Sequence, residues 1–581
     1  MSNEEKQMMY RHSMSHVLAK AIKSLYPNVK LAIGPAIENG FYYDFDNLAL
    51  SQDDFAKIED KMREIINSNA DFIRKEVSKS EALEMFVDEP YKTELINELP
   101  SDETITVYYT GEDFYDLCRG PHVENTKFLR GFSYKINRVN GAYWRGSEKN
   151  KMLTRIYVYG FLNKDDLKEC LRLEEEAKER DHRKIGKDLG VYMTSELVGK
   201  GLPMWLPKGF ILRRTLSDYI MDKEIKLGYQ HVMTPSLGNI NLYKTSGHWE
   251  HYQEDMFPVM ERDDEAYVLR PMNCPHHMVI YKSFMHSYRD LPLRLAEIAN
   301  DFRFEASGTL CGIERTRAFT QNDSHIFCRP DQIESEIASV IQLILDVYKD
   351  FGLKEYSFRL SLRDKANAEK YFANDELWEK SEDALRKILK DSGADFYEAV
   401  GEAAFYGPKI DVQVKTALGH EVTLSTVQLD YQLPERFELE YIDENNDRVR
   451  PVVIHRAILG SLDRFVAFIL EETKGVLPAW LSPVQVKILT VSEKNENYAS
   501  EICNKLKNLN FRVELDTNNE SVGKKIRTAV LEKAPFILVI GDKEMEENLV
   551  SVRKRGSKDT NSEPFDDFLK ELSDAIAEKS L

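Results

Sequence analysis

The sequence predicts a multidomain protein that combines α+β and α/β folds. The chain has 581 residues, which is too many for one hydrophobic core and indicates three or four domains. Residues 1–162 mix helical and strand patterns, whereas residues 190–480 are rich in aromatic side chains and contain long strand patterns. Residues 481–581 alternate strand and helix patterns, which is typical of a βαβ series.

The composition is that of an ordinary soluble globular protein, with 42% hydrophobic and 30% charged residues. No apolar run approaches the roughly 18 residues of a membrane span, so we expect no membrane partner. The N-terminus is acidic and lacks the apolar core of a signal peptide. Its 6 cysteines are sparse, which suits a reducing cytoplasm. The net charge of −19 argues mildly against a nucleic-acid partner, but a local basic patch can still bind phosphate.

Two segments are predicted to connect these domains. Residues 163–189 are strongly charged and contain no proline, which favours an exposed connecting helix. Residues 477–483 hold two prolines too close together for a helix to continue, which indicates a linker. After it we expect a small parallel sheet with helices on both faces. The expected strands are residues 486–491, 511–515 and 536–540, and the expected helices are residues 496–508 and 521–533.

Cys274, His325 and His455 are candidate metal ligands. Cys274 lies in a proline-bounded loop, and His455 follows an apolar strand pattern. Alternation along a strand puts Gln321, Asp323 and His325 on one face. One thiolate and two imidazoles would leave a fourth position of tetrahedral zinc open, as in catalytic sites. The spacing alone is a weak signal, because 6 cysteines and 13 histidines offer many such sets.

A second group of residues suits phosphate chemistry. Two antiparallel strands joined by a long loop would place Arg303 and Glu305 near Arg315 and Phe319. Arginine captures phosphate through two parallel hydrogen bonds and stays charged when desolvated. Glu305 can accept from an exocyclic amine, and Phe319 can stack on a purine. The alternative is an edge hairpin with solvated arginines, although the mixture of residue types on this face is unusual for one.

A third cluster lies near the N-terminus. His12 and His16 are four residues apart and share one helical face, and Cys118 and His122 follow about a hundred residues later. Spacing alone favours a four-ligand zinc site. For His12 and His16 by themselves, capping or buried histidines are a plausible alternative.

Several of these segments resemble the class II aminoacyl-tRNA synthetases. Phe302–Glu305 with Arg315 and Phe319 resembles motif 2, residues 460–465 resemble motif 3, and residues 233–235 resemble the dimer-forming motif 1. Residues 270–276, 405–411 and 454–461 narrow the resemblance to the threonyl-tRNA synthetases, over essentially the whole chain. The resemblance implies a class II antiparallel-sheet catalytic core at 190–480, an α+β editing domain at 1–162 and an α/β anticodon-binding domain at 481–581.

The resemblance also implies roles in the catalytic domain. One zinc ion per subunit would be held by Cys274, His325 and His455, with the amine and hydroxyl of L-threonine completing its shell. Valine, which has no hydroxyl, would leave a ligand position empty. Asp323 would orient the hydroxyl, Gln321 and Tyr406 would line the pocket, and Lys409 would lie near the carboxylate or phosphate. The residues implied in ATP binding are Arg303 (α-phosphate), Glu305, Arg315 (γ-phosphate), Phe319, Gln428, Ser461 and Arg464 (adenine). Magnesium would bridge ATP oxygens, and the sequence does not identify its ligands.

For the N-terminal domain the resemblance implies hydrolysis of serine mischarged onto tRNA(Thr). Serine can ligate zinc as threonine does, and a missing methyl group changes binding by only ~1–3 kcal/mol. The residues implied are His12, His16, Lys92, Asp116, Cys118 and His122. We favour a reading without a metal, in which the cluster binds the ribose end and activates water, and the presence of a metal stays open.

The partners implied are tRNA(Thr), ATP, L-threonine and a second copy of the chain in a homodimer. Asn519, Glu544 and Arg553 match positions that contact anticodon bases. His12 comes too early to leave room for the ubiquitin-like domain of many relatives, so we expect that domain to be absent. Two alternatives remain: a class II synthetase for another amino acid, such as proline or serine, or an inactive paralogue that acts as an RNA-binding regulator or free-standing editor.

Overall fold

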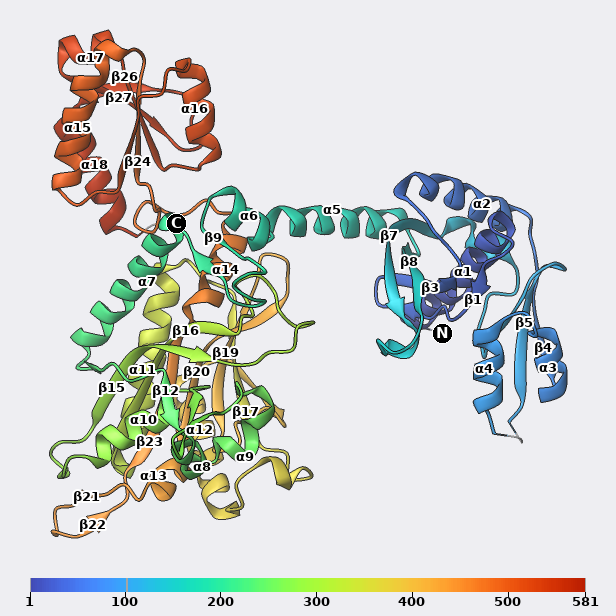
Figure 1. The fold of residues 1–581 in the computed structure, drawn as a ribbon, viewed down its shortest axis with the longest axis horizontal. Coiled ribbons are helices and arrows are strands. Elements are labelled where there is room, and N and C mark those ends of the chain that lie inside the picture. The colour runs from blue at the N-terminus through green and yellow to red at the C-terminus, as the bar shows by residue number, and fades with distance from the viewer. Residues whose placement is uncertain (1, 101–102, 580–581) are drawn as a thin grey trace. The chain divides into compact units, whose positions relative to one another are not determined.

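The computed structural model describes residues 2–100 and 103–579. It contains two compact units, Met1–Glu176 and Ala177–Leu581 (Figure 1). Among the described residues, no helix is both long and apolar enough to cross a membrane.

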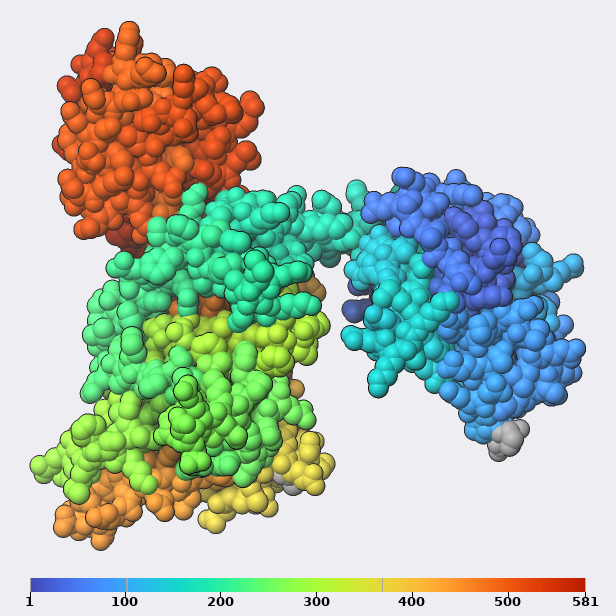
Figure 2. Space-filling model, viewed as in Figure 1, coloured from blue at the N-terminus to red at the C-terminus, as the bar shows by residue number. Residues whose placement is uncertain are grey.

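The first unit is built on a five-stranded sheet, in which β1, β3, β8 and β7 follow one another and β2 pairs with β3. Phe41, Tyr43 and Phe45 alternate along β3 and are buried, because successive side chains of a strand point to opposite faces. Met14 and Leu18 of helix α1 complete this core. The bounds are α1 (Asn3–Leu25), α2 (Phe55–Asn67), β1 (Lys30–Leu31), β2 (Ala36–Ile37), β3 (Gly40–Asp46), β7 (Ser133–Tyr143) and β8 (Met152–Phe161). In space-filling view the cyan residues of β7 and β8 lie against blue residues far earlier in the chain (Figure 2).

A second, three-stranded sheet in the same unit has the order β4-β5-β6 and its own small core around Phe86, Ile96 and Val107. It carries the Cys118 segment immediately after β6, opposite α1. Its elements are β4 (Phe72–Val77), α3 (Lys79–Met85), α4 (Pro90–Glu98), β5 (Ile105–Thr110) and β6 (Tyr115–Leu117).

The second unit contains an eight-stranded sheet with the order β11-β15-β16-β23-β20-β19-β17-β18. All its pairings are antiparallel except β11 with β15 and β17 with β18. This agrees with the antiparallel catalytic core expected from the sequence. The strands are β11 (Gln230–His231), β15 (Leu293–Phe302), β16 (Ala318–Cys328), β17 (Tyr356–Leu362), β18 (Phe396–Val400), β19 (Lys409–Lys415), β20 (Glu421–Asp430) and β23 (Val452–Ser461).

Helices cover this sheet and bury its apolar side chains. Ile337 and Ile344 of α11 and Phe465 and Ile469 of α14 belong to one large core with Ile454 of β23. The principal helices are α7 (Pro207–Lys226), α10 (Cys274–Lys282), α11 (Ile333–Asp350), α12 (Asp375–Ser392) and α14 (Leu462–Glu472). The smaller elements are β9 (Tyr192–Met193), β10 (Met204–Trp205), β12 (Leu237–Asn239), α8 (Ile240–Ser246), α9 (His248–Tyr252), β13 (Met260–Arg262), β14 (Glu265–Leu269), α13 (Gln432–Arg436), β21 (Tyr441–Ile442) and β22 (Arg448–Val449).

A buried ion pair joins α7 to the centre of the sheet. Arg456 Nη1 lies 2.6 Å from Glu224 Oε1, and neither side chain is exposed to solvent. Glu224 also accepts from Asn322 Nδ2 at 2.8 Å. One carboxylate therefore holds the adjacent strands β16 and β23 to the same helix.

The prediction of one exposed connecting helix at 163–189 is wrong in one respect. The segment forms two helices, α5 (Lys164–Arg180) and α6 (His182–Asp188). No residue of α5 is fully buried, as the charge pattern predicts, but His182, Ile185 and Gly186 of α6 are buried. The high charge of the whole segment concealed this short apolar contact.

The C-terminal sheet was expected to be parallel, and it is mixed. Strand β24 pairs in parallel with β25 and β26, but β27 and β28 extend the sheet in the antiparallel sense. The sequence pattern of βαβαβ ended at residue 540, so the last two strands were missed. The elements are β24 (Val486–Thr490), α15 (Glu496–Asn508), β25 (Val513–Asp516), α16 (Val522–Leu531), β26 (Phe536–Ile540), α17 (Asp542–Glu547), β27 (Leu549–Lys554), β28 (Asn561–Pro564) and α18 (Phe565–Ala577).

Candidate active sites

Strand register places the central candidates in a row across the large sheet. Lys409 of β19 pairs with Gln428 of β20. Gln428 in turn pairs with His455 of β23, which pairs with His325 of β16. Directly paired residues point to the same face. Four side chains that are far apart in sequence therefore share one surface.

A second row lies two residues along the same strands. Asp411 pairs with Thr426, Thr426 with Ala457, and Ala457 with Asp323. Because the period of a strand is two, this row faces the same way as the first. Gln321, the next residue of β16 on this face, lies beyond a bulge and pairs with Ser461.

These rows form the floor of a cavity of about 440 Å³. Its wall comes from α10, from the segment 402–406 and from Arg303 at the end of β15. Of the residues predicted from the sequence, it is lined by Cys274, Arg303, Gln321, Asp323, His325, Tyr406, Lys409, Gln428 and His455.

Cys274, His325 and His455 are all buried, and their ligand atoms lie within 4.8 Å of one another. His455 Nε2 is 2.8 Å from Asp430 Oδ2, so Nδ1 is the nitrogen left to face a metal. His325 Nδ1 is 2.9 Å from His277 Nδ1. His325 Nε2 is buried and has no hydrogen-bond partner among the described residues. This orphaned nitrogen and the mixed Cys/His donor set fit a zinc ion.

Residues behind the ligands hold them in place. His277 Nε2 lies 3.2 Å from Glu297 Oε2, so hydrogen bonds connect His325 through His277 to a carboxylate. Asp430 does the same for His455. Carboxylate partners of this kind orient metal-binding imidazoles and fix their tautomers.

Burial determines the charge of this cluster in the absence of an ion. It raises the pKa of the Cys274 thiol and lowers the pKa of His325. It also raises the pKa of Asp323 to about 8, with a smaller contribution from the nearby Asp301 carboxylate. A bound cation reverses this tendency, because it favours the thiolate and carboxylate forms.

The candidate ATP residues are only partly brought together. The Arg303 guanidinium lies over the Phe319 ring at 5.1 Å, and Arg315 Nε is 3.7 Å from Glu305 Oε2. This agrees with the proximity expected for the two ends of the loop 303–317. Glu305, Arg315, Phe319, Ser461 and Arg464 nevertheless lie outside the lining of the cavity. Arg464 is exposed at the start of α14, where its backbone N–H donates to Ser461 Oγ at 3.3 Å.

Lys409 has a defined partner on its own strand. Its ammonium lies 2.7 Å from Asp411 Oδ2. Arg359 and Ser361 also donate to this buried carboxylate, each at 2.8 Å. Tyr406 Oη donates to Oε1 of Gln428, the residue paired with Lys409 across the strands.

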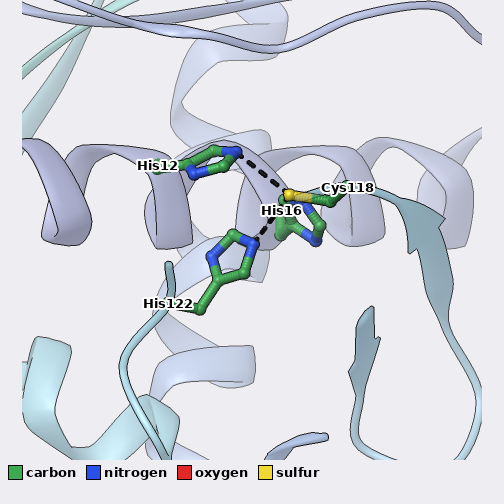
Figure 3. Close-up of side chains that lie close together, drawn as sticks. All are labelled: His12, His16, Cys118 and His122. Atoms are coloured by element: carbon green, nitrogen blue, oxygen red, sulfur yellow. Dashed lines mark hydrogen bonds between the residues drawn. The ribbon is translucent and has the colours of Figure 1, made fainter. Parts of the chain in front are cut away.

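The N-terminal cluster forms as the sequence predicts (Figure 3). His12 and His16 project from one face of α1, and Cys118 and His122 approach from the segment after β6. Cys118 Sγ lies 3.2 Å from His12 Nε2 and 3.1 Å from His122 Nε2. The backbone N–H of Gly120 donates to the same sulfur at 3.2 Å. The ligand-type atoms of all four residues lie within 4.8 Å of one another.

Lys92 and Asp116 form an ion pair beside this cluster. Lys92 Nζ is 2.5 Å from Asp116 Oδ1, and their side chains are 3% and 2% exposed. Tyr43 Oη donates to Asp116 Oδ2 at 2.5 Å. Such a fully paired carboxylate is held in one orientation, which suits a group that must position a substrate or water.

The four central residues of the N-terminal cluster are uncharged at neutral pH. Burial lowers the pKa of His12, His16 and His122. It raises the pKa of the Cys118 thiol to about 12. The cluster is therefore a set of neutral donors and acceptors.

Sequence reasoning missed the supporting residues. His277 had a signal, since it stands three residues after Cys274 on one helical face. Ser13 also had one, as a neighbour of His12: its hydroxyl is 3.2 Å from His122 Nδ1. Glu297 and Asp430 had none, because nothing in their local patterns shows which strands become neighbours.

The candidate anticodon residues lie at separate places around the C-terminal sheet. Asn519 follows β25 and is exposed, and Glu544 follows β26. Glu544 accepts from Ser551 Oγ at 2.7 Å and from the backbone N–H of Gly541 at 3.0 Å. Arg553 pairs with Ile537, near the other end of β26.

Three segments match known domain families. Residues 257–473 match the tRNA synthetase class II core domain (G, H, P, S and T). Residues 485–575 match an anticodon binding domain. Residues 105–157 match the threonyl and alanyl tRNA synthetase second additional domain.

The chain is also similar to named relatives. It is 55% identical to the threonine–tRNA ligase of Geobacillus kaustophilus over 573 residues, which is 98% of this chain and 87% of the relative. A crystal structure of the RNA binding domain of threonyl-tRNA synthetase from Cryptosporidium parvum aligns with a TM-score of 0.65 and 37% identity, over 68% of this chain and 98% of that one. A putative threonyl-tRNA synthetase from Aeropyrum pernix aligns with a TM-score of 0.61 and 26% identity, over 69% and 97% of the two chains.

The candidate metal site of Cys274, His325 and His455 can be tested by the metal content of the purified protein. We expect about one zinc ion per chain in protein purified without chelator, and a loss of most of it in Cys274→Ala, because two imidazoles alone bind zinc weakly. Elemental analysis measures this directly. Cys170→Ala, on α5, is the matched control and should retain its zinc. Equal zinc in both variants would exclude Cys274 as a ligand.

Acid should destabilise the first unit. In the unfolded chain His12, His16 and His122 gain protons as the pH falls through about 6.5, whereas burial keeps them neutral in the folded unit to lower pH. The unfolded state therefore binds more protons, and stability decreases between pH 7 and about 5.5. Hydrogen exchange of α1 in the intact chain at both pH values measures the change. His16→Gln should reduce this loss of stability. An equal loss in that variant would contradict the role of the buried histidines.

Proposed function

The chain belongs to the threonyl-tRNA synthetase family, and from this premise we propose the residues with which it carries out the family's reaction. It is a threonine–tRNA ligase with an editing domain: it activates L-threonine with ATP, transfers the threonyl group to tRNA(Thr) and hydrolyses mischarged Ser-tRNA(Thr). The observation that carries the residue assignments is the cavity over the central sheet, where Cys274 lies close to His325 and His455 of the first row.

We assign selection of threonine to the cluster of Cys274, His325 and His455. Zinc held there would be open to the amine and the hydroxyl of threonine, and valine has the amine but no hydroxyl. Asp323 Oδ2 lies 3.9 Å from His325 Nε2, the nitrogen without a partner. It is therefore placed to accept a hydrogen bond from the substrate hydroxyl. A substrate without that hydroxyl leaves buried polar groups unpaired. This penalty is larger than the net stabilisation that one hydrogen bond provides.

The remaining polar residues orient the reacting groups. Lys409 is fixed by Asp411 and faces the cavity, so it can attract the threonine carboxylate or the α-phosphate. Arg303 lines the cavity wall, so it can bind the α-phosphate. Magnesium bound with ATP would offset the negative charge of the phosphates. The reaction, attack of the carboxylate on the α-phosphorus, then depends mainly on positioning and on neutralising charge.

ATP binding requires a change at the rim of the cavity. Arg315 is paired with Glu305 rather than directed into the cavity, and Arg464 is exposed. We propose that Arg315 turns to the γ-phosphate, Phe319 and Arg464 enclose adenine, and Glu305, Gln428 and Ser461 complete the site. Exposed arginines can make such movements at little cost, because no buried partner is lost.

We assign editing to His12, His16, Cys118 and His122, with Lys92 and Asp116 beside them. The Cys118 sulfur already has three hydrogen-bonding neighbours. Cys118 contacts His12 and His122, whereas His16 Nδ1 is buried without a hydrogen-bond partner among the described residues. We propose that this neutral cluster binds the ribose end and orients water without a metal. The fixed Lys92 ammonium can donate a hydrogen bond to the carbonyl oxygen of the mischarged serine.

A homodimer is proposed from the exposed apolar residues around motif 1. Phe210 and Ile225 of α7 are 59% and 58% exposed, and Met233 is 94% exposed. Exposed large apolar side chains along α7 and the motif 1 segment favour an interaction surface there, and a two-fold axis would pair the segment with itself. We further propose a cytoplasmic location, domain boundaries at 162, 189 and 480, and contacts of Asn519, Glu544 and Arg553 with the anticodon.

Amino-acid selectivity tests the proposal most directly. ATP–pyrophosphate exchange should be fastest with threonine, measurable with serine and close to background with valine. Asp323→Ala should lower kcat/KM for threonine at least ten-fold, because a buried hydrogen bond to the hydroxyl is lost. Equal activity with valine and threonine would overturn the assigned pocket.

Editing should be separable from synthesis. Cys118→Ala, or His12→Ala with His16→Ala, should strongly reduce hydrolysis of Ser-tRNA(Thr) and leave formation of Thr-tRNA(Thr) near normal. The two sites share no residue, so their effects should be close to independent. Deacylation assays with preformed Ser-tRNA(Thr) measure the first activity. If these variants also lost threonine activation, the two-site assignment would be wrong.

The dimer can be tested at its proposed surface. Sedimentation should give a dimer at micromolar concentration, and Met233→Lys with Ile225→Lys should shift it towards monomer, since two charges would be buried against like charges. Val400→Lys is a control, because Val400 is 67% exposed in another part of the chain. An active wild-type monomer would refute the proposal.

A further inference from the structure

Helix α6 carries a buried histidine that contacts the loop between β15 and β16. His182 is only 1% exposed. Its Nδ1 lies 2.6 Å from Glu471 Oε1, and its Nε2 accepts a hydrogen bond from the backbone N–H of Ile313 at 3.3 Å. Because a backbone N–H can only donate, Nε2 carries no proton, and the Nδ1–H group donates to the Glu471 carboxylate.

The loop is shaped to fit against this ring. Gly312 has a φ of +48°, and a Cβ atom there would lie 2.2 Å from His182 Nε2. Only glycine allows such an approach. Beside it, Cys311 and Arg315 exchange two backbone hydrogen bonds of 3.1 Å. These two hydrogen bonds form a tight turn that contains Gly312 and Ile313, the residues in contact with His182. Arg315 is the last residue of this turn.

The histidine rests on a rigid support. Arg180 donates to the carbonyl oxygens of Glu471 and Glu472, at 2.9 and 2.8 Å, and so caps the end of α14. Ile185, one turn after His182, is part of the large hydrophobic core. His182 thus links the loop to the helix that begins at motif 3.

We propose that His182 is a positioning residue for ATP binding, which holds the loop 303–317 in the shape that presents Arg315 to the nucleotide. The proposal rests on the ATP role assigned to this loop above. His182 contacts no substrate in this scheme. His182 restricts the loop before ATP binds, so less conformational entropy is lost on binding.

Activation kinetics give the first test. His182→Ala and Gly312→Ala should each raise KM for ATP by roughly five- to ten-fold, as for the loss of one buried hydrogen bond. KM for threonine should stay within about two-fold, because the floor of the cavity is untouched. Lys187→Ala, on the exposed face of the same helix, is the matched control and should behave as wild type. Equal changes of both KM values would indicate general damage and overturn the proposal.

Reactivity of Cys311 gives a second test that does not depend on activity. Cys311 adjoins the held residues and is partly exposed. Its alkylation by iodoacetamide, followed by peptide mass spectrometry, should be faster in His182→Ala and Gly312→Ala than in wild type. Cys170, also partly exposed but on α5, is the internal reference. Unchanged Cys311 reactivity in both variants would overturn the proposal.

Arg315→Ala separates this inference from the function on which it rests. If Arg315→Ala raises KM for ATP and the His182 and Gly312 variants do not, the positioning role is wrong and the ATP assignment stands. If Arg315→Ala leaves KM for ATP unchanged, the ATP assignment of the loop fails, and the positioning role fails with it.

Discussion

Strand register is the constraint on which the central site depends. His325, His455, Gln428 and Lys409 meet only because each is opposite the next across four strands. A slip of one residue in β23 would turn His455 to the other face of the sheet. The buried pair of Arg456 and Glu224 opposes this slip, because separating it leaves an unpaired buried charge that costs about 3–5 kcal/mol. A structural ion pair on one face thus protects the chemistry on the other.

The two histidine–cysteine clusters use similar donors in different states. Cys118 has three hydrogen-bonding neighbours, whereas Cys274 has one contact of 3.6 Å, to His248 Nε2. In the cluster of Cys274, His325 and His455, a carboxylate contacts His455 directly and reaches His325 only through His277. The N-terminal cluster is instead contacted by Ser13, the Gly120 N–H and the Phe72 ring, which stacks on His122 at 5.2 Å. This difference in surroundings is the basis on which a metal is proposed for the first cluster and metal-free water chemistry for the second.

The sequence was informative where local pattern determines geometry. Alternation along β16 predicted the shared face of Gln321, Asp323 and His325, and helical spacing predicted the pairing of His12 with His16. It failed where distant segments decide. Nothing near Glu297 or Asp430 shows which imidazole each will support, and the charge of residues 163–189 hid the burial of His182. The sequence also could not predict the conformation of the Arg464 side chain, because the conformation of an exposed side chain depends on the ligand that it contacts.

The order of the two sites along the chain has a consequence for synthesis on the ribosome. The residues of the N-terminal cluster all lie within the first unit, whereas the central cluster needs His455 as well as Cys274. At about 5–20 residues per second, the interval between completing the first unit and adding His455 is on the order of ten seconds or more. Domains generally fold as units in that order. A nascent chain therefore acquires its proofreading fold before it can load any amino acid, and an incomplete chain cannot charge tRNA without correction.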